Sequence, residues 1–131
     1  EGCQALEENL MQLTEELGIE PDIALGTLGA FRAGPLIQSV TRHAKNLYLL
    51  EPNQPRAVKR EDLASQIPSD FPGQVILSTI RDLFPQPGYC SVAGKGRCLV
   101  VTGSIYLIGE VSEALYHEVP PEESMLQDPI R

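Results

Sequence analysis

Four short apolar runs, separated by segments with helical spacing, constrain the fold of this chain more than any other feature. Continuous apolar runs of this length are typical of strands that are buried on both faces of a parallel sheet. Alternation of such strands with helices favours parallel neighbours joined by right-handed crossovers. We therefore predict a three-layer α/β fold with a mostly parallel sheet, whose strands lie near residues 23–29, 47–50, 75–77 and 98–101.

The helices are predicted from apolar spacing and from Gly and Pro positions. The first spans residues 3–17 and ends at Gly18, because leucines recur on one helical face, at Leu6, Leu10, Leu13 and Leu17. The second starts at Gly34-Pro35, since Pro is tolerated at a first helical position. A third, short helix covers residues 59–66.

The stretch 75–84 has two interpretations. It is either a strand at 75–77 followed by a short helix capped by Ser78, or a single helix throughout. The strand and helix are favoured, because the β-α alternation needs a strand at this place.

Length and charge indicate one domain with acidic ends. The chain has 131 residues, enough for one domain with a real core, and a net charge of −8. Residues 1–20 hold six acids and no base, and residues 116–131 hold four acids and one base. We predict one domain over residues 1–116 and an acidic, Pro-containing tail over 117–131. No cluster of bases and aromatic residues indicates a nucleic-acid partner.

Other features point to a cytoplasmic protein with no membrane partner. No apolar run is long enough to cross a bilayer, and no signal peptide precedes the first helix. Three cysteines, an odd number without metal spacing, are expected to be reduced thiols. His43 and His117 are expected to be exposed, and neither has a partner at metal-ligand spacing, so no metal site is predicted.

The strongest candidate site is Thr102-Gly103-Ser104, where the last apolar run changes into a helix. Such a turn brings hydroxyl groups and the N–H groups of a helix N-terminus to one place, which favours an anion. In open α/β sheets, ligands gather outside the carboxyl ends of the strands. The plainer interpretation is that Thr or Ser only caps the helix, and the two roles can coexist.

Residues 100–111 resemble the closing strand, turn and helix of the C-terminal domain of the dihydrofolate synthase/folylpolyglutamate synthase family, in the Mur ligase superfamily. Members of that family typically read V-T-G-S-L-Y-L-V-G-E-V there. A weaker similarity covers residues 47–50, Pro55-Arg56-Ala57 and Leu63-Ala64. The resemblance implies a Rossmann-like domain of the Mur ligase C-terminal type, with helices on both faces of the sheet.

The resemblance also implies a function. Enzymes of this family are ATP-dependent ligases that add glutamate to dihydropteroate or folate through an acyl phosphate. The C-terminal lobe positions glutamate and closes over ATP, and Ser104, with Thr102 and Gly103, matches the glutamate-binding positions. ATP and Mg²⁺ are bound mainly by an N-terminal ATPase domain, expected before Glu1 together with a D-G-A-H-N motif. This chain alone is expected to be inactive and to supply no catalytic residue.

The chain departs from the family pattern at one place and leaves other functions open. The family has a Lys-Asp pair where this chain has Arg32-Ala33, although Arg32 could still face the cleft. Arg56 matches an Arg-Ala pair and is either a cleft residue or a solvated loop arginine. One alternative is a divergent, non-catalytic α/β module for binding or dimerisation. A stand-alone nucleotide-binding protein is disfavoured, because the spacing of Gly26 and Gly29 is too common to indicate a phosphate loop.

Overall fold

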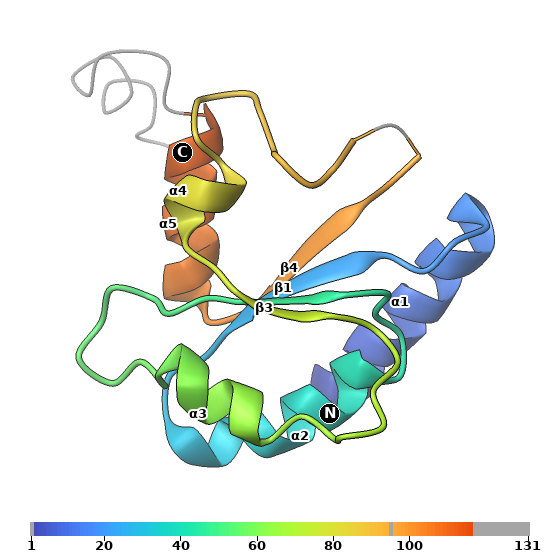
Figure 1. The fold of residues 1–131 in the computed structure, drawn as a ribbon, viewed down its shortest axis with the longest axis horizontal. Coiled ribbons are helices and arrows are strands. Elements are labelled where there is room, and N and C mark those ends of the chain that lie inside the picture. Colours follow the sequence, from blue (N-terminus) through green and yellow to red (C-terminus); the bar gives the residue numbers. More distant parts are fainter. Residues whose placement is uncertain (1, 95, 117–131) are drawn as a thin grey trace.

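The sheet is parallel throughout the part of the chain that the computed structural model describes, residues 2–94 and 96–116 (Figure 1). Each neighbouring pair of strands is parallel, in the order β3-β2-β1-β4. The strands are β1 (Asp22–Gly26), β2 (Leu47–Leu49), β3 (Val75–Leu77) and β4 (Leu99–Gly103). The strand interpretation of residues 75–77 is therefore confirmed.

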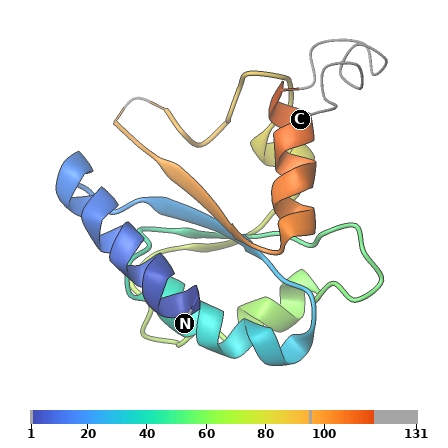
Figure 2. The same cartoon turned by 180° about the vertical axis from the view of Figure 1, so that it is seen from behind.

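Helices cover both faces of the sheet, so the predicted three-layer α/β arrangement is confirmed (Figure 2). One side carries α1 (Gly2–Leu17), α2 (Ala30–Thr41) and α3 (Arg60–Ser65). The other side carries α4 (Ile80–Leu83) and α5 (Ile105–Tyr116). The arrangement is consistent with a Rossmann-like fold. Within the described residues, no helix is both long enough and apolar enough to cross a membrane.

Strand β1 joins two hydrophobic clusters, because successive side chains of a strand point to opposite faces. Ile23 and Leu25 pack with the first three helices, whereas Ala24 packs with α4 and α5. All three side chains are fully buried. The first cluster also contains Leu10, Ala33, Ile37, Val40, Leu47, Leu49 and Leu63, and the second contains Leu50, Leu83, Phe84, Leu107 and Val111. The middle of the sheet is thus covered on both sides, whereas Val75 and Leu77 of the edge strand β3 are 36 % and 42 % exposed.

Two predicted helix starts are wrong. Helix α2 begins at Ala30, so Pro35 lies inside it rather than at its first position. Burial of one helical face, which includes Ala33 and Ile37, outweighs the one hydrogen bond that Pro35 cannot donate. Helix α4 is capped by Thr79, whose Oγ1 accepts a hydrogen bond from the N–H of Asp82 at 3.0 Å. Ser78 does not take this role, because α4 begins at Ile80 and the backbone of Ser78 still continues the strand, with its N–H donating to the Leu49 carbonyl at 2.9 Å.

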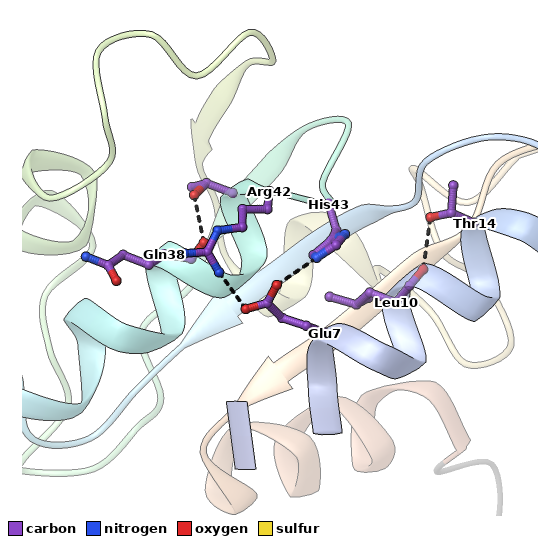
Figure 3. Close-up of polar contacts among 7 residues, drawn as sticks. Glu7, Leu10, Thr14, Gln38, Arg42 and His43 are labelled. Atoms are coloured by element: carbon purple, nitrogen blue, oxygen red, sulfur yellow. Dashed lines mark hydrogen bonds and ion pairs between the residues drawn. The ribbon is translucent and has the colours of Figure 1, made fainter. Parts of the chain in front are cut away.

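Helix α1 is joined to the end of α2 by a cluster of charged side chains (Figure 3). Glu7 lies 2.6 Å from Nη1 of Arg42 and 3.0 Å from Nε2 of His43. The hydrogen bond from His43, assisted by Ser39 and the charge of Arg42, lowers the pKa of Glu7 against the opposing effect of burial. The prediction that His43 is exposed is wrong, because its side chain is only 16 % exposed beneath Glu7.

A second polar cluster ties the amino ends of the strands together. The carboxylate of Asp22 is 1 % exposed, and it accepts hydrogen bonds from Nδ2 of Asn46 and Nε of Arg97, both at 3.0 Å. Oδ1 of Asn46 in turn accepts the N–H of Gln74 at 2.9 Å. The hydrogen bond and the negative charge of Asp22 raise the pKa of Arg97. Together the contacts satisfy a buried charge at the edge opposite the candidate site. The predicted tail, residues 117–131 with His117, lies outside the described residues.

Candidate functional site at the carboxyl edge of the sheet

The order in which successive strands are added to the sheet changes direction between β1 and β4. From β1 the strands run outward through β2 to β3, and the chain then returns over the opposite face to place β4 on the other side of β1. The order β3-β2-β1-β4 matches the first four strands of the doubly wound order 3-2-1-4-5-6. Ligands of such sheets bind at this topological switch point, outside the carboxyl ends of the strands. Thr102 and Gly103 end β4 at that point, and Ser104 joins them to α5, which begins at Ile105.

Glycines let the backbone segments at the switch point approach one another closely. Gly103 has a φ of 127°, and a Cβ added to it would lie 1.9 Å from the carbonyl oxygen of Gly26. A Cβ on Gly26 would lie 2.9 Å from the carbonyl oxygen of Leu50. The Gly26 carbonyl also accepts the N–H of Ser104 at 3.0 Å. The ends of β1 and β4 are therefore in direct backbone contact, and they fix the position of Ser104.

Ser104 caps helix α5. Its Oγ accepts a hydrogen bond from the N–H of Tyr106 at 2.9 Å, and its carbonyl accepts the N–H of Ile108 at 3.1 Å. The capping interpretation of this turn is therefore confirmed. Because a serine hydroxyl has one donor and two acceptor sites, capping leaves the O–H group available to another acceptor. Ser104 and Thr102 are half-buried and Gly103 is exposed, so the turn remains accessible to solvent.

Of the two arginines predicted near the cleft, the structure describes the side chain of Arg56 alone. Nη2 of Arg56 lies 3.4 Å from the place that a Cβ added to Gly29 would take. The backbone carbonyl of Arg56 accepts a hydrogen bond from the N–H of Gly29 at 3.1 Å. Arg56 thus lies against the loop between β1 and α2 and is exposed. Arg32 is in the first turn of α2, but its side chain lies outside the described part of the structure, so its place in the cleft stays a prediction.

Glu110 is a contact residue that the sequence reasoning did not assign. Its Oε2 accepts the N–H of Asn53 at 2.8 Å, which ties α5 to the loop after β2. The sequence does single out Glu110, because it matches the Glu of the family pattern V-T-G-S-L-Y-L-V-G-E-V. Its partner could not be found by local reasoning, since the two residues lie 57 positions apart.

Arg60 was also missed, and it joins the ends of β2 and β3. Its Nη1 donates to the Ser78 carbonyl at 2.7 Å, and its backbone N–H lies 3.4 Å from Oε1 of Glu51. Two buried polar atoms on this side of the molecule, Arg60 Nε and Thr27 Oγ1, have no hydrogen-bond partner among the described residues. No signal in the sequence distinguishes Arg60 from its neighbours Lys59 and Arg56.

This arrangement is suited to holding an anion. It combines the free O–H of Ser104 with the partial positive charge at the N-terminus of α5. Within residues 2–94 and 96–116, no group of three or more His, Cys, Asp or Glu side chains is placed to hold a metal ion. Comparisons of the chain with protein-family models, with curated proteins and with solved structures gave no match.

Proposed function

We propose that this chain is the C-terminal lobe of a ligase of the folylpolyglutamate/dihydrofolate synthase type, with the Mur ligase C-terminal fold. In this proposal the lobe positions glutamate, whose amine attacks a folate or dihydropteroate acyl phosphate. ATP and Mg²⁺ are assigned to an N-terminal ATPase domain of the same cytoplasmic enzyme, and the role of this lobe is limited to binding and orienting glutamate.

The observation that supports the proposal most strongly is the position of Ser104. The serine that matches the family's glutamate-binding residue lies at the switch point of a parallel sheet and at the N-terminus of a 12-residue helix. Its O–H can donate to a carboxylate while its Oγ remains the cap of α5. Holding glutamate in this way is an orientation role, which brings the amine into reach of an acyl group held by another domain.

A thermal unfolding experiment on the 131-residue chain tests the proposal. A ligand that binds only the folded state raises the melting temperature as its concentration increases. We expect L-glutamate to raise the melting temperature more than D-glutamate at equal concentration, since both enantiomers share the same general salt effect. In Ser104→Ala the difference between the two enantiomers should disappear.

The matched control is Thr79→Ala, which removes the cap of α4 instead of the cap of α5. This variant should lose stability but keep the difference between L- and D-glutamate. The alternative, a non-catalytic binding or dimerisation module, predicts equal effects of the two enantiomers on the parent chain, and that result would reject the glutamate site.

A further inference from the structure

The switch point between β1 and β4 is flanked by the N-termini of two helices that lie on opposite faces of the sheet. The chain leaves β1 toward α2 on one face, and it leaves β4 toward α5 on the other (Figure 1). In open parallel sheets, ligands bind between two loops that diverge in this way. Both helices have 12 residues, and the N-terminus of each carries a partial positive charge. Ser104 lies on the α5 side, so the α2 side is a second position for an anionic group.

The start of α2 has polar groups that no described side chain satisfies. Its N-cap, Gly29, has a φ of 79° and provides no side-chain cap, so the first N–H groups of the helix lack the partner that a cap would give them. Thr27 follows Leu25 by two residues, which places it on the face of the sheet that carries α2. The Thr27 side chain is 3 % exposed, and its Oγ1 has no hydrogen-bond partner among the described residues.

The loop after β2, residues 51–58, brings a cation to the same place. At one point the N–H of Asn53 donates to Oε2 of Glu110 on α5 at 2.8 Å. At another, the carbonyl of Arg56 accepts the N–H of Gly29, just before α2, at 3.1 Å. The loop is therefore attached to both sides of the switch point. Because Nη2 of Arg56 lies 3.4 Å from the place that a Cβ added to Gly29 would take, the guanidinium lies beside the N-cap of α2.

Arg56 forms no ion pair with any residue in the described part of the chain. Two glutamates near its loop contact other groups: Glu110 accepts the N–H of Asn53, and Oε1 of Glu51 lies 3.4 Å from the backbone nitrogen of Arg60. The net charge of −8 comes from the ends of the chain, since residues 21–115 hold eight acids and nine bases. A guanidinium binds a carboxylate through two parallel hydrogen bonds, so Arg56 is suited to an acidic ligand.

We propose that Arg56 makes this site specific for a dicarboxylic amino acid, by binding one carboxylate of glutamate at the start of α2 while Ser104 binds the other at the start of α5. The inference rests on the proposed glutamate site at Ser104 and adds the group that recognises the second carboxylate. Gly26, which contacts Ser104, and Gly29, which contacts Arg56, are three residues apart, so their Cα atoms lie within about 11 Å of each other. Glutamate, together with the long and exposed side chain of Arg56, spans a distance of this order.

Titration of the labelled 131-residue chain, followed by amide NMR at constant ionic strength, tests this role of Arg56. L-Glutamine and L-isoglutamine each replace one carboxylate of L-glutamate by an uncharged amide. Arg56→Gln should weaken the binding of L-glutamate and of one amide by about tenfold, because each loses a charge-assisted contact, and it should leave the other amide unchanged. The variant should fold normally, since the Arg56 side chain is exposed and the backbone contact with Gly29 is retained.

The matched control is Lys45→Gln, which removes the same charge from an exposed residue just before β2, at the amino edge of the sheet. This variant should bind all three compounds as the parent does. If Arg56→Gln affected both amides equally, or left the binding of L-glutamate unchanged, the role of Arg56 would be overturned while a glutamate site that depends on Ser104 would stand. A parent chain without saturable binding of L-glutamate would overturn this inference together with the proposed function.

Discussion

At the scale of single residues, the switch point depends on glycine where the backbones touch. We predict that Gly103→Ala lowers the free energy of unfolding by at least roughly 3 kcal/mol, because a methyl group combines an unfavourable φ with a severe clash. Its Cβ would lie 1.9 Å from the Gly26 carbonyl oxygen. Gly109→Ala is the matched control and should raise stability by roughly 0.5–1 kcal/mol, since alanine favours a helix and the site is open.

Urea unfolding of both variants measures these differences. If Gly103→Ala and Gly109→Ala changed the free energy of unfolding equally, the close approach of β1 and β4 at Gly103 would be contradicted.

Glu7 makes the stability of the molecule depend on pH. Its pKa in the folded chain lies below the ordinary value of 4.5, so the carboxylate stabilises the fold above that pH. This contribution is lost as the pH falls through the lowered pKa. We therefore predict that Glu7→Gln is less stable than the parent at neutral pH, and that the difference becomes small in acid.

The measurement is the free energy of unfolding of both chains between about pH 3 and pH 7. Glu8→Gln, at the exposed neighbouring position of α1, should keep the profile of the parent. Parallel profiles for Glu7→Gln and the parent would contradict the assigned role of the Arg42 and His43 contacts.

At the scale of elements, α1 is attached to the rest of the domain by the fully buried Leu10 and by the contacts of Glu7 with Arg42 and His43. Leu10 is 1 % exposed within the cluster beneath the sheet. We predict that Leu10→Ala lowers the free energy of unfolding by about 2–5 kcal/mol, because it leaves a cavity between α1 and the core. Leu17→Ala, on the same helix but 44 % exposed, should change it by less than about 0.5 kcal/mol.

Chemical denaturation gives both values. A small effect of Leu10→Ala would mean that α1 is not packed as an integral part of the domain.

Most elements could be predicted from local patterns, and each error has an identifiable physical cause. The four apolar runs form strands, and the two whose side chains are most deeply buried, β1 and β2, lie in the middle of the sheet. Pro35 suggests a first helical position, but α2 already begins at Ala30, and the buried Ala33 packs this extra turn against the core. His43 was misjudged because its partner Glu7 lies 36 residues away, and no local pattern joins them.

At the scale of the whole molecule, the candidate site depends on strand order, which local patterns do not contain. The sequence indicated a polar turn at residues 102–104 and a strand before it. It did not indicate that β4 lies beside β1, so the switch point and the contact between Gly26 and Gly103 emerged only from the structure. The hydrogen bond from the N–H of Asn53 to Glu110 at the same edge could not be predicted either, because it joins residues 57 positions apart.

Whether the turn at Ser104 holds the carboxylate of glutamate can be measured by amide NMR of the labelled 131-residue chain. L-Glutamate should shift the N–H signals of Ser104, Ile105 and Tyr106 in a saturable way. Loss of one hydrogen bond to a charged group costs roughly 1.5–3 kcal/mol, so Ser104→Ala should weaken binding by about ten- to a hundred-fold. Unchanged signals at this turn, or equal saturation in Ser104→Ala and the parent, would contradict a glutamate site at Ser104.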